Sequence, residues 1–304
     1  MDCGKLMVGG ARRLGAAVML CMLATAASAE TVIFSTTEAV SFDGTTYQKG
    51  DLAQWDGERL QPYLSIFGGS RNLDAVYVFA GGDVLLSISG SGSQTLGGVT
   101  FRSGDLVRYD PVAGTASLYL MGSSSTSGTD AFGHRQSIFR TSNGSETSGD
   151  IDAVHVLWNG NILLSTAGSA RLWSDHGLLR FSDEDLVEYN PVTGLATMFF
   201  DFDEFFSTDE DIDAVSVLLN GHLLLSATSA VTIGGVTFAE GDLFEFDTLT
   251  RQASLYFSRD DLAKCSFDID AVHVLAPSIP EPATMGLLGL GLGFMLVRRR
   301  PKSA

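Results

Sequence analysis

Aspartate recurs at one position of a repeated Asp-Ala-Val sequence, and it is the residue with the clearest potential for chemistry. The motif occurs four times, and three copies carry a further aspartate two residues earlier. Carboxylates gathered at one point repel one another unless a cation or protons neutralise them. Calcium takes six to eight oxygen ligands of this kind. The pattern predicts a candidate calcium site at Asp74, Asp152, Asp213 and Asp270, with Asp150, Asp211 and Asp268 nearby.

A structural interpretation of these aspartates competes with the metal and is favoured, because a feature present in every repeat usually serves the repeat. Each carboxylate would accept hydrogen bonds from backbone N–H groups where its own strand begins. The same interpretation applies to a second marker, Asp-Leu before a strand with alternating aromatic residues. It occurs at Asp51, Asp105, Asp185 and Asp242.

The other reactive residue types form no catalytic pattern. The five histidines have no spacing typical of zinc ligands, and no serine lies in a nucleophile-elbow motif. His155 and His273 occupy equivalent positions in their repeats, where the other repeats have Tyr77 and Ser216. Cys265 would be the only thiol left after removal of an N-terminal leader, so the fold must depend on its core rather than on disulfides.

Charge is concentrated in the body of the chain. Between Glu30 and Pro280 there are 12 Lys and Arg against 34 Asp and Glu, a net charge of −22. Nucleic-acid-binding proteins carry basic patches, so this balance argues against nucleic acid and against docking on anionic lipid. It favours solubility in an exported protein and is compatible with divalent cations.

The body is a repeat protein, because the two aspartate markers alternate strictly along it. They define four units, each predicted to form two β-hairpins. Asn159-Gly160 and Asn220-Gly221 stand between apolar runs, where Asn-Gly predicts a two-residue turn with positive φ at both residues. The sequence predicts an all-β fold without an amphipathic helix.

The two ends of the body complete each other. The last unit stops after 270–275, and residues 32–52 align with the later part of a unit, as Val32–Ser35 matches Leu223–Ser226. A repeat array divided between the termini closes into a ring, which removes open sheet edges. We therefore expect a four-bladed β-propeller over residues 30–276, with the Asp-Ala-Val strand innermost. A fifth blade, if residues 121–149 form strands, and an open β-solenoid are the alternatives; the Ser/Gly/Thr-rich insert 121–149 is expected to be a flexible loop.

The N-terminus predicts export. Lys5, Arg12 and Arg13 precede an apolar run, and Ala27-Ser28-Ala29 fits a signal-peptidase site, so residues 1–29 are a predicted signal peptide and the mature chain begins at Glu30. A twin-arginine signal at Arg12-Arg13 and a lipoprotein cysteine at Cys21 fit their flanking residues less well.

The C-terminus has three parts in a specific order: Pro280-Glu281-Pro282, an apolar run at 283–297, and Arg298-Arg299-Arg300. As a helix the run would span roughly 22 Å at about 1.5 Å per residue, a marginal transmembrane helix whose arginines would remain cytoplasmic. Residues 277–304 resemble the PEP-CTERM sorting signal. The resemblance implies recognition and cleavage near Pro280–Pro282 by an exosortase-type membrane enzyme.

Together these features predict an exported protein, transiently membrane-anchored, then on the cell surface or in the extracellular matrix. The favoured function is a non-enzymatic module that binds polysaccharide or a surface partner. A calcium-dependent hydrolase or lactonase-like propeller is the alternative, and a self-associating envelope component is a third. Calcium is the one cofactor that the sequence suggests.

Overall fold

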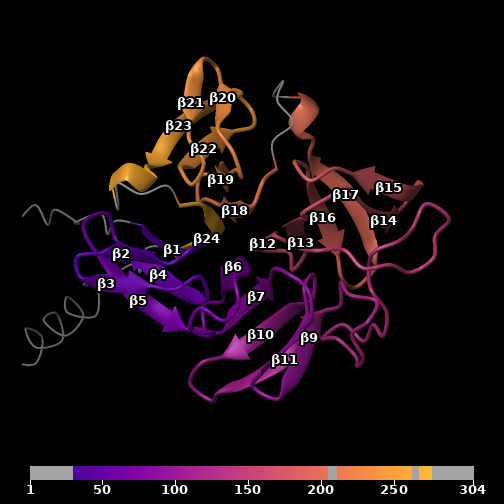
Figure 1. Ribbon diagram of the computed structural model, residues 1–304. Coiled ribbons are helices and arrows are strands. Elements are labelled where there is room, and N and C mark those ends of the chain that lie inside the picture. The colour runs from indigo at the N-terminus through magenta and orange to yellow at the C-terminus, as the bar shows by residue number, and fades with distance from the viewer. Residues whose placement is uncertain (1–29, 205–210, 262–266, 276–304) are drawn as a thin grey trace, which may run out of the picture.

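The computed structural model describes residues 30–204, 211–261 and 267–275, and these form four antiparallel sheets around a common axis (Figure 1). Each sheet has four strands and is called a blade. The all-β, four-bladed propeller expected from the repeats is confirmed. The helical structure in the described ranges is two 3-10 turns, η1 (Phe202–Glu204) and η2 (Arg259–Asp261).

The blades are given from the axis outward. Blade 1 has β24 (Ile269–Leu275), β1 (Thr31–Thr36), β4 (Asp51–Trp55) and β5 (Leu60–Ser65). Blade 2 has β6 (Leu73–Val78), β7 (Val84–Ile88), β10 (Leu106–Asp110) and β11 (Thr115–Leu120). Blade 3 has β12 (Ala153–Val156), β13 (Ile162–Ser165), β16 (Leu186–Asn190) and β17 (Leu195–Phe200). Blade 4 has β18 (Ala214–Val217), β19 (Leu223–Ser226), β22 (Leu243–Asp247) and β23 (Gln252–Phe257).

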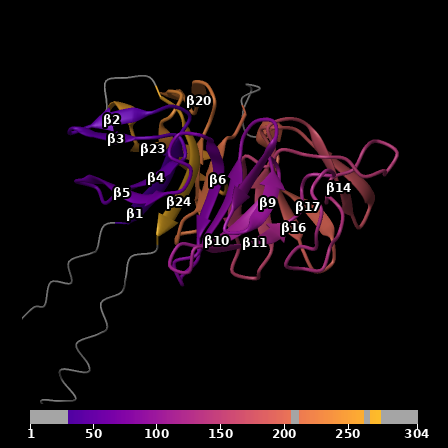
Figure 2. The same ribbon diagram turned by 60° about the horizontal axis from the view of Figure 1, so that its bottom comes forward.

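Blade 1 closes the ring by joining the two ends of the described chain. β1 pairs with β24 from Thr31 opposite Leu275 to Thr36 opposite Ile269, and Figure 2 shows the two strands side by side. Three N-terminal strands and one C-terminal strand therefore make one sheet. The innermost strand of every blade is the one that carries Asp-Ala-Val, as expected.

Each blade also carries a small two-stranded hairpin between its second and third strands. These hairpins are β2–β3 (Val40–Phe42, Thr45–Tyr47), β8–β9 (Ser93–Leu96, Val99–Arg102), β14–β15 (Ala170–Ser174, Gly177–Phe181) and β20–β21 (Val231–Ile233, Val236–Phe238). The tip of β20–β21 has positive φ at both Gly234 and Gly235, the geometry of a tight hairpin turn.

The Asn-Gly turns differ from the expected two-residue type. Leu157 donates to the carbonyl of Asn161, and only Gly160 of the Asn-Gly pair has positive φ. Asn159 instead accepts a hydrogen bond from the Asn161 backbone through Oδ1. The hairpin is present as predicted, but the turn is longer because the asparagine side chain itself caps it.

The insert at 121–149 is a loop with one isolated bridge between Arg140 and Glu146, so it adds no fifth blade. The middle of the insert is packed against the blades, and its flexibility stays a prediction. Ile138 and Phe139 are buried in a cluster with residues of both blade 2 and blade 3. Gly149 allows this packing, since a Cβ there would lie 2.6 Å from the Phe139 ring.

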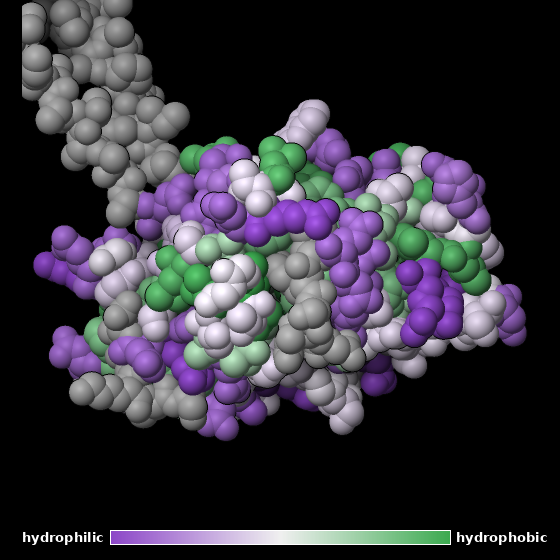
Figure 3. Space-filling view, turned by 90° about the horizontal axis from the view of Figure 1, so that it is seen from above, coloured by the Kyte–Doolittle hydropathy of each residue, from purple (hydrophilic) through white to green (hydrophobic). Residues whose placement is uncertain are grey.

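The hydrophobic core lies between blades rather than within one. Four clusters each join two neighbouring blades: 2 with 3, 3 with 4, 4 with 1, and 1 with 2. Burial of apolar surface contributes about 25 cal/mol per Å², so each blade depends on both neighbours. On the face seen in Figure 3, hydrophobic and hydrophilic residues are interspersed.

Several sequence predictions fall outside the described residues. They are the signal peptide 1–29 with its cleavage site at Ala27 and Ala29, Cys265, and the tail 277–304 with its apolar run 283–297. Among the residues that are described, no helix has the length and apolar character to cross a membrane.

Candidate functional site in the central channel

The four innermost strands, β24, β6, β12 and β18, pack against one another around the axis. Figure 1 shows them meeting at the centre of the ring. Because the blades repeat around the axis, these strands run in the same direction, and their starts define one mouth of a channel and their ends the other. A strand rises about 3.3 Å per residue, so side chains three residues apart on these strands lie roughly 10 Å apart along the channel.

The starts of these strands bring the predicted aspartates together. Asp74, Asp152, Asp213 and Asp270 are each 4–5% exposed, and every neighbouring pair around the ring is close enough for the two charges to interact. We call these four residues the aspartate ring. Both carboxylate oxygens of Asp152 and Asp213, and one each of Asp74 and Asp270, are buried without a hydrogen-bond partner. The expected capping by backbone N–H groups is absent at Asp213, whereas the Asp152 carboxylate interacts with its own backbone.

A second set of side chains links the aspartate ring from blade to blade. The residue two positions before each ring aspartate lies against the ring aspartate of the preceding blade: Asp150 by Asp74, Asp211 by Asp152, and Asp268 by Asp213. The fourth position holds Asn72, whose amide donates to Asp270 Oδ2. Asn72 was not predicted from the sequence. The available signal is its position, two residues before Asp74, where the other three repeats have an aspartate.

Electrostatics at this mouth favours protonated carboxyls. Burial first, and neighbouring carboxylates second, raise the pKa of Asp74, Asp152 and Asp213 well above the usual range. Burial also raises the pKa of Asp150 and Asp268 to about 6 and of Asp211 to about 7. The Asn72 amide donates a hydrogen bond to the Asp270 carboxylate. At the other three positions, a proton held between the two carboxyls of a pair could play the same part.

The fit of a metal ion to this mouth is incomplete. The donor set, carboxylate oxygens with unsatisfied lone pairs, is chemically right for calcium. However, no group of three or more His, Cys, Asp or Glu side chains among the described residues is placed to hold a metal. The calcium site at Asp74, Asp152, Asp213 and Asp270 stays a prediction.

The second aspartate marker caps its own turn in every blade, as expected. Oδ2 of each accepts the backbone N–H three residues earlier, at 2.8–3.0 Å. The other oxygen fixes the segment after the blade's outermost strand in three blades: Gly122 and Ser123 for Asp105, Phe202 for Asp185, and Arg259 for Asp242.

The opposite mouth of the channel is apolar and aromatic. A pocket of about 590 Å³ is lined there by residues from all four innermost strands, including Tyr77, His155, Val217 and His273. We call it the mouth pocket. Tyr77 makes edge contacts with both imidazoles, at ring-centroid distances of 5.1 Å to His155 and 4.5 Å to His273. Burial lowers the pKa of His155 to about 4 and that of His273 to about 3, so both are neutral at pH 7.

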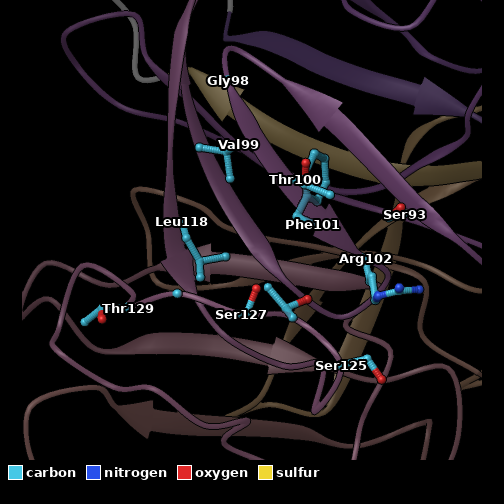
Figure 4. Close-up of a pocket in the computed structure, with 12 residues that line it drawn as sticks. Ser93, Gly98, Val99, Thr100, Phe101, Arg102, Leu118, Ser125, Ser127 and Thr129 are labelled. Carbon is cyan, nitrogen blue, oxygen red and sulfur yellow. The ribbon is translucent and has the colours of Figure 1, made fainter.

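A further pocket, of about 490 Å³, lies on blade 2 between the β8–β9 hairpin and residues 125–129 of the insert. Figure 4 shows the hydroxyls of Thr100, Ser125 and Ser127 around it, with the guanidinium of Arg102 at one side. Within the described residues, none of its side-chain oxygens is both buried and without a partner. The pocket therefore has the character of an exposed surface hollow.

Residues 278–300 match the family model described as the PEP-CTERM protein-sorting motif. The resemblance seen in Pro280-Glu281-Pro282, the apolar run and Arg298–Arg300 is thereby confirmed. The motif implies export, membrane-anchored sorting to the cell surface and processing by an exosortase. No curated protein matches the chain.

Solved structures that match are distant. A protein of unknown function from Bacteroides caccae is 10% identical, with 80% of this chain and 77% of that one covered and a TM-score of 0.31. Virginiamycin B lyase from Staphylococcus aureus is 8% identical, with 76% and 85% covered and a TM-score of 0.34. The chain spans about a quarter of the first two matches, extracellular domains of B. thetaiotaomicron proteins, at TM-scores of 0.28 and 0.29.

Proposed function

We propose that this exported protein is a non-enzymatic binding module of the cell surface or extracellular matrix, and that its propeller binds polysaccharide. The observation that carries the proposal is the sorting motif at 278–300, which directs the chain to the surface. In this account residues 1–29 are removed as a signal peptide and the mature protein begins at Glu30. The exosortase-type enzyme then acts near Pro280–Pro282.

The closed ring favours a binding module over a structural component that assembles by pairing of open sheet edges. Joining β1 to β24 gives blade 1 the same four strands as the other blades, and the innermost strand of each blade packs against those of its neighbours around the axis. The net charge of −22 between Glu30 and Pro280 also disfavours anionic partners unless a divalent cation bridges them. Neutral polysaccharide, or a cation-bridged acidic one, is therefore the ligand class that suits this surface.

Calcium enters the proposal through the aspartate ring. Its buried oxygens without partners would be the ligands, and a cation there would replace the protons that otherwise neutralise the carboxyls. The calcium-dependent hydrolase remains the second candidate because the same carboxylates would hold its metal.

The test is binding of the full-length protein, purified in mild detergent, to the producing organism's extracellular polysaccharide. We expect retention on the immobilised polymer in buffer with calcium. A chelator, and separately the Asp152→Asn/Asp213→Asn variant, show whether the ring contributes. Lack of retention with and without calcium contradicts the proposal, and release of shortened polymer or an opened lactone would favour the hydrolase.

A further inference from the structure

The mouth pocket breaks the symmetry of the repeats. The position three residues after each ring aspartate is occupied by Tyr77, His155, Ser216 and His273. At about 590 Å³ the pocket lies within the roughly 300–1,000 Å³ typical of small-molecule sites. A feature that only served the blades would repeat in all four. Three residue types at one repeated position, tyrosine, serine and histidine twice, are typical of a site that fits an asymmetric ligand.

The polar groups of the pocket have defined hydrogen-bonding roles. His155 Nδ1 accepts a hydrogen bond from the Val217 backbone at 3.2 Å. Because the imidazole is neutral, its proton is on Nε2, which is a donor. Ser216, at the same repeat position in blade 4, is fully buried outside the lining, and its Oγ accepts from the Val274 backbone at 3.1 Å.

One buried atom of the pocket has no partner. His273 is 6% exposed, and its Nδ1 is buried without a hydrogen-bond partner. An unpaired buried polar atom costs about 1–3 kcal/mol. A ligand hydroxyl that reached this nitrogen would remove the cost.

The remaining lining sets the charge and shape of the ligand. Glu30 is the one formally charged side chain in the lining, and its carboxylate already accepts from the Tyr256 hydroxyl at 2.9 Å. With no lysine or arginine in the lining, an anion would meet only a carboxylate. Tyr63, Phe79 and Leu275 add aromatic and aliphatic surface.

We propose that the mouth pocket binds one neutral sugar residue, with its hydroxyls on His155, His273 and Tyr77 and its C–H face on the aromatic rings. A sugar ring combines an apolar face with hydroxyls that both donate and accept, which is the complement of this lining. The assignment rests on the proposed polysaccharide function and names the site at which the polymer is held.

A variant that fills the pocket without altering the fold is available from the repeat itself. Ala80 lines the pocket from an exposed turn, and the equivalent position in blade 3 is Trp158, which is 97% exposed. Tryptophan is thus already tolerated at this turn position. Ala80→Trp should obstruct the pocket, and Val112→Trp, at a position of blade 2 that is 97% exposed and outside the lining, is the matched control.

The experiment measures binding of glucose, galactose, mannose and N-acetylglucosamine to the full-length protein by saturation-transfer NMR, together with retention on the polysaccharide. We expect at least one sugar to bind, about tenfold weaker binding in Ala80→Trp, a smaller loss in Tyr77→Phe, and no change in Val112→Trp. Glucuronate should bind more weakly than the neutral sugars.

The two proposals fail in different ways. If the unaltered protein is retained on the polysaccharide and Ala80→Trp is retained equally, the pocket assignment is overturned and the polysaccharide function stands. If the unaltered protein binds neither the polymer nor any of the four sugars, both are overturned.

Discussion

At the scale of single residues, the contrast between Asn72 and the three acids at equivalent positions is the most informative feature of the channel. Asn72 donates to Asp270 without needing a proton from solution. Asp150, Asp211 and Asp268 interact with their ring partners through charge, so each of these pairs avoids repulsion only while one of its carboxyls is protonated. Three of the four links between blades should therefore weaken as the pH rises.

The sign of the pH effect follows from the proton count. Burial raises the pKa of Asp211 to about 7, against about 3.9 in an unfolded chain. Between these values the folded state holds more protons than the unfolded state, so stability falls as pH rises through this range. The pKa values of His155 and His273 are lowered to about 4 and about 3, so these residues make stability rise with pH. Above about pH 6.5 both are neutral in the folded and the unfolded state, and their effect on the pH dependence ends.

We expect Asp211→Asn to raise the free energy of unfolding at pH 8 by about 1–2 kcal/mol and to have a much smaller effect at pH 5, because one pKa unit corresponds to about 1.4 kcal/mol. Urea unfolding at both pH values, with chelator present, checks this. Asp175→Asn, at an exposed hairpin tip, makes the same charge change and should show no such difference. Equal effects of Asp211→Asn at pH 5 and pH 8 would contradict a raised pKa of Asp211 in the folded protein.

At the scale of elements, the capping aspartate of each blade fixes the segment that follows the outermost strand. Asp105 is fully buried and accepts from Gly122, Ser123, Arg102 and the Thr126 hydroxyl. It therefore sets where the insert leaves blade 2. Asp51, at the same position in blade 1, has one backbone donor and an exposed bond to Ser65.

Asp105→Ala should lower the free energy of unfolding by about 2–4 kcal/mol, since it leaves several buried N–H groups unpaired at about 1–3 kcal/mol each. The amides of Gly122 and Ser123 should also exchange faster with deuterium. Asp51→Ala is the matched variant and should cost less. If both variants lost the same stability without faster exchange in the insert, the anchoring role of Asp105 would be wrong.

The elements were predictable to the extent that local sequence determines them. Alternating apolar strands, the Asp markers and the complementary ends were sufficient for four blades and for the closing sheet. The insert was not, because the burial of Phe139 depends on a space between blades 2 and 3 that no local pattern reveals. In the channel, the repeat was sufficient to predict that the four aspartates share a position. Their lack of hydrogen-bond partners and the bond from Asn72 to Asp270 were not predictable, because both depend on contacts between blades.

At the scale of the whole molecule, closure of the ring depends on one strand. β1 pairs with β24 on one side and β4 on the other, and Ile33 and Phe34 are buried in different interblade clusters. Removal of this strand would expose both neighbours and open two clusters at once.

A chain that begins at Thr37 should therefore fail to unfold cooperatively, and a synthetic peptide of residues 30–36 should restore the transition by adding the missing strand. Circular dichroism melting with and without peptide measures this. A peptide of the same composition in scrambled order serves as the control. A cooperative transition without any peptide would show that the ring does not need this closure.

We expect the position of the chain ends to orient the molecule during sorting. Glu30 and Leu275 both line the mouth pocket, and the sorting motif begins at residue 278. Residues 275 and 283 are eight steps apart, so at most about 29 Å of extended chain joins the propeller to the apolar run. While that run is held in a membrane, the mouth pocket should face the bilayer and the aspartate ring should face away.

Two labelling sites distinguish this orientation from its reverse. Leu219 lines the mouth pocket and is 73% exposed, whereas Thr228 is exposed next to Asp211, whose carbonyl accepts its N–H. In a full-length background with Cys3, Cys21 and Cys265 changed to serine, a fluorophore on Leu219→Cys should be quenched by spin-labelled lipid headgroups in vesicles. The same fluorophore on Thr228→Cys should be quenched much less, and a chain lacking 277–304 should show no quenching at either site. Stronger quenching at Thr228→Cys would place the aspartate ring toward the membrane and would mean that the polymer reaches the mouth pocket even before the tail is cleaved.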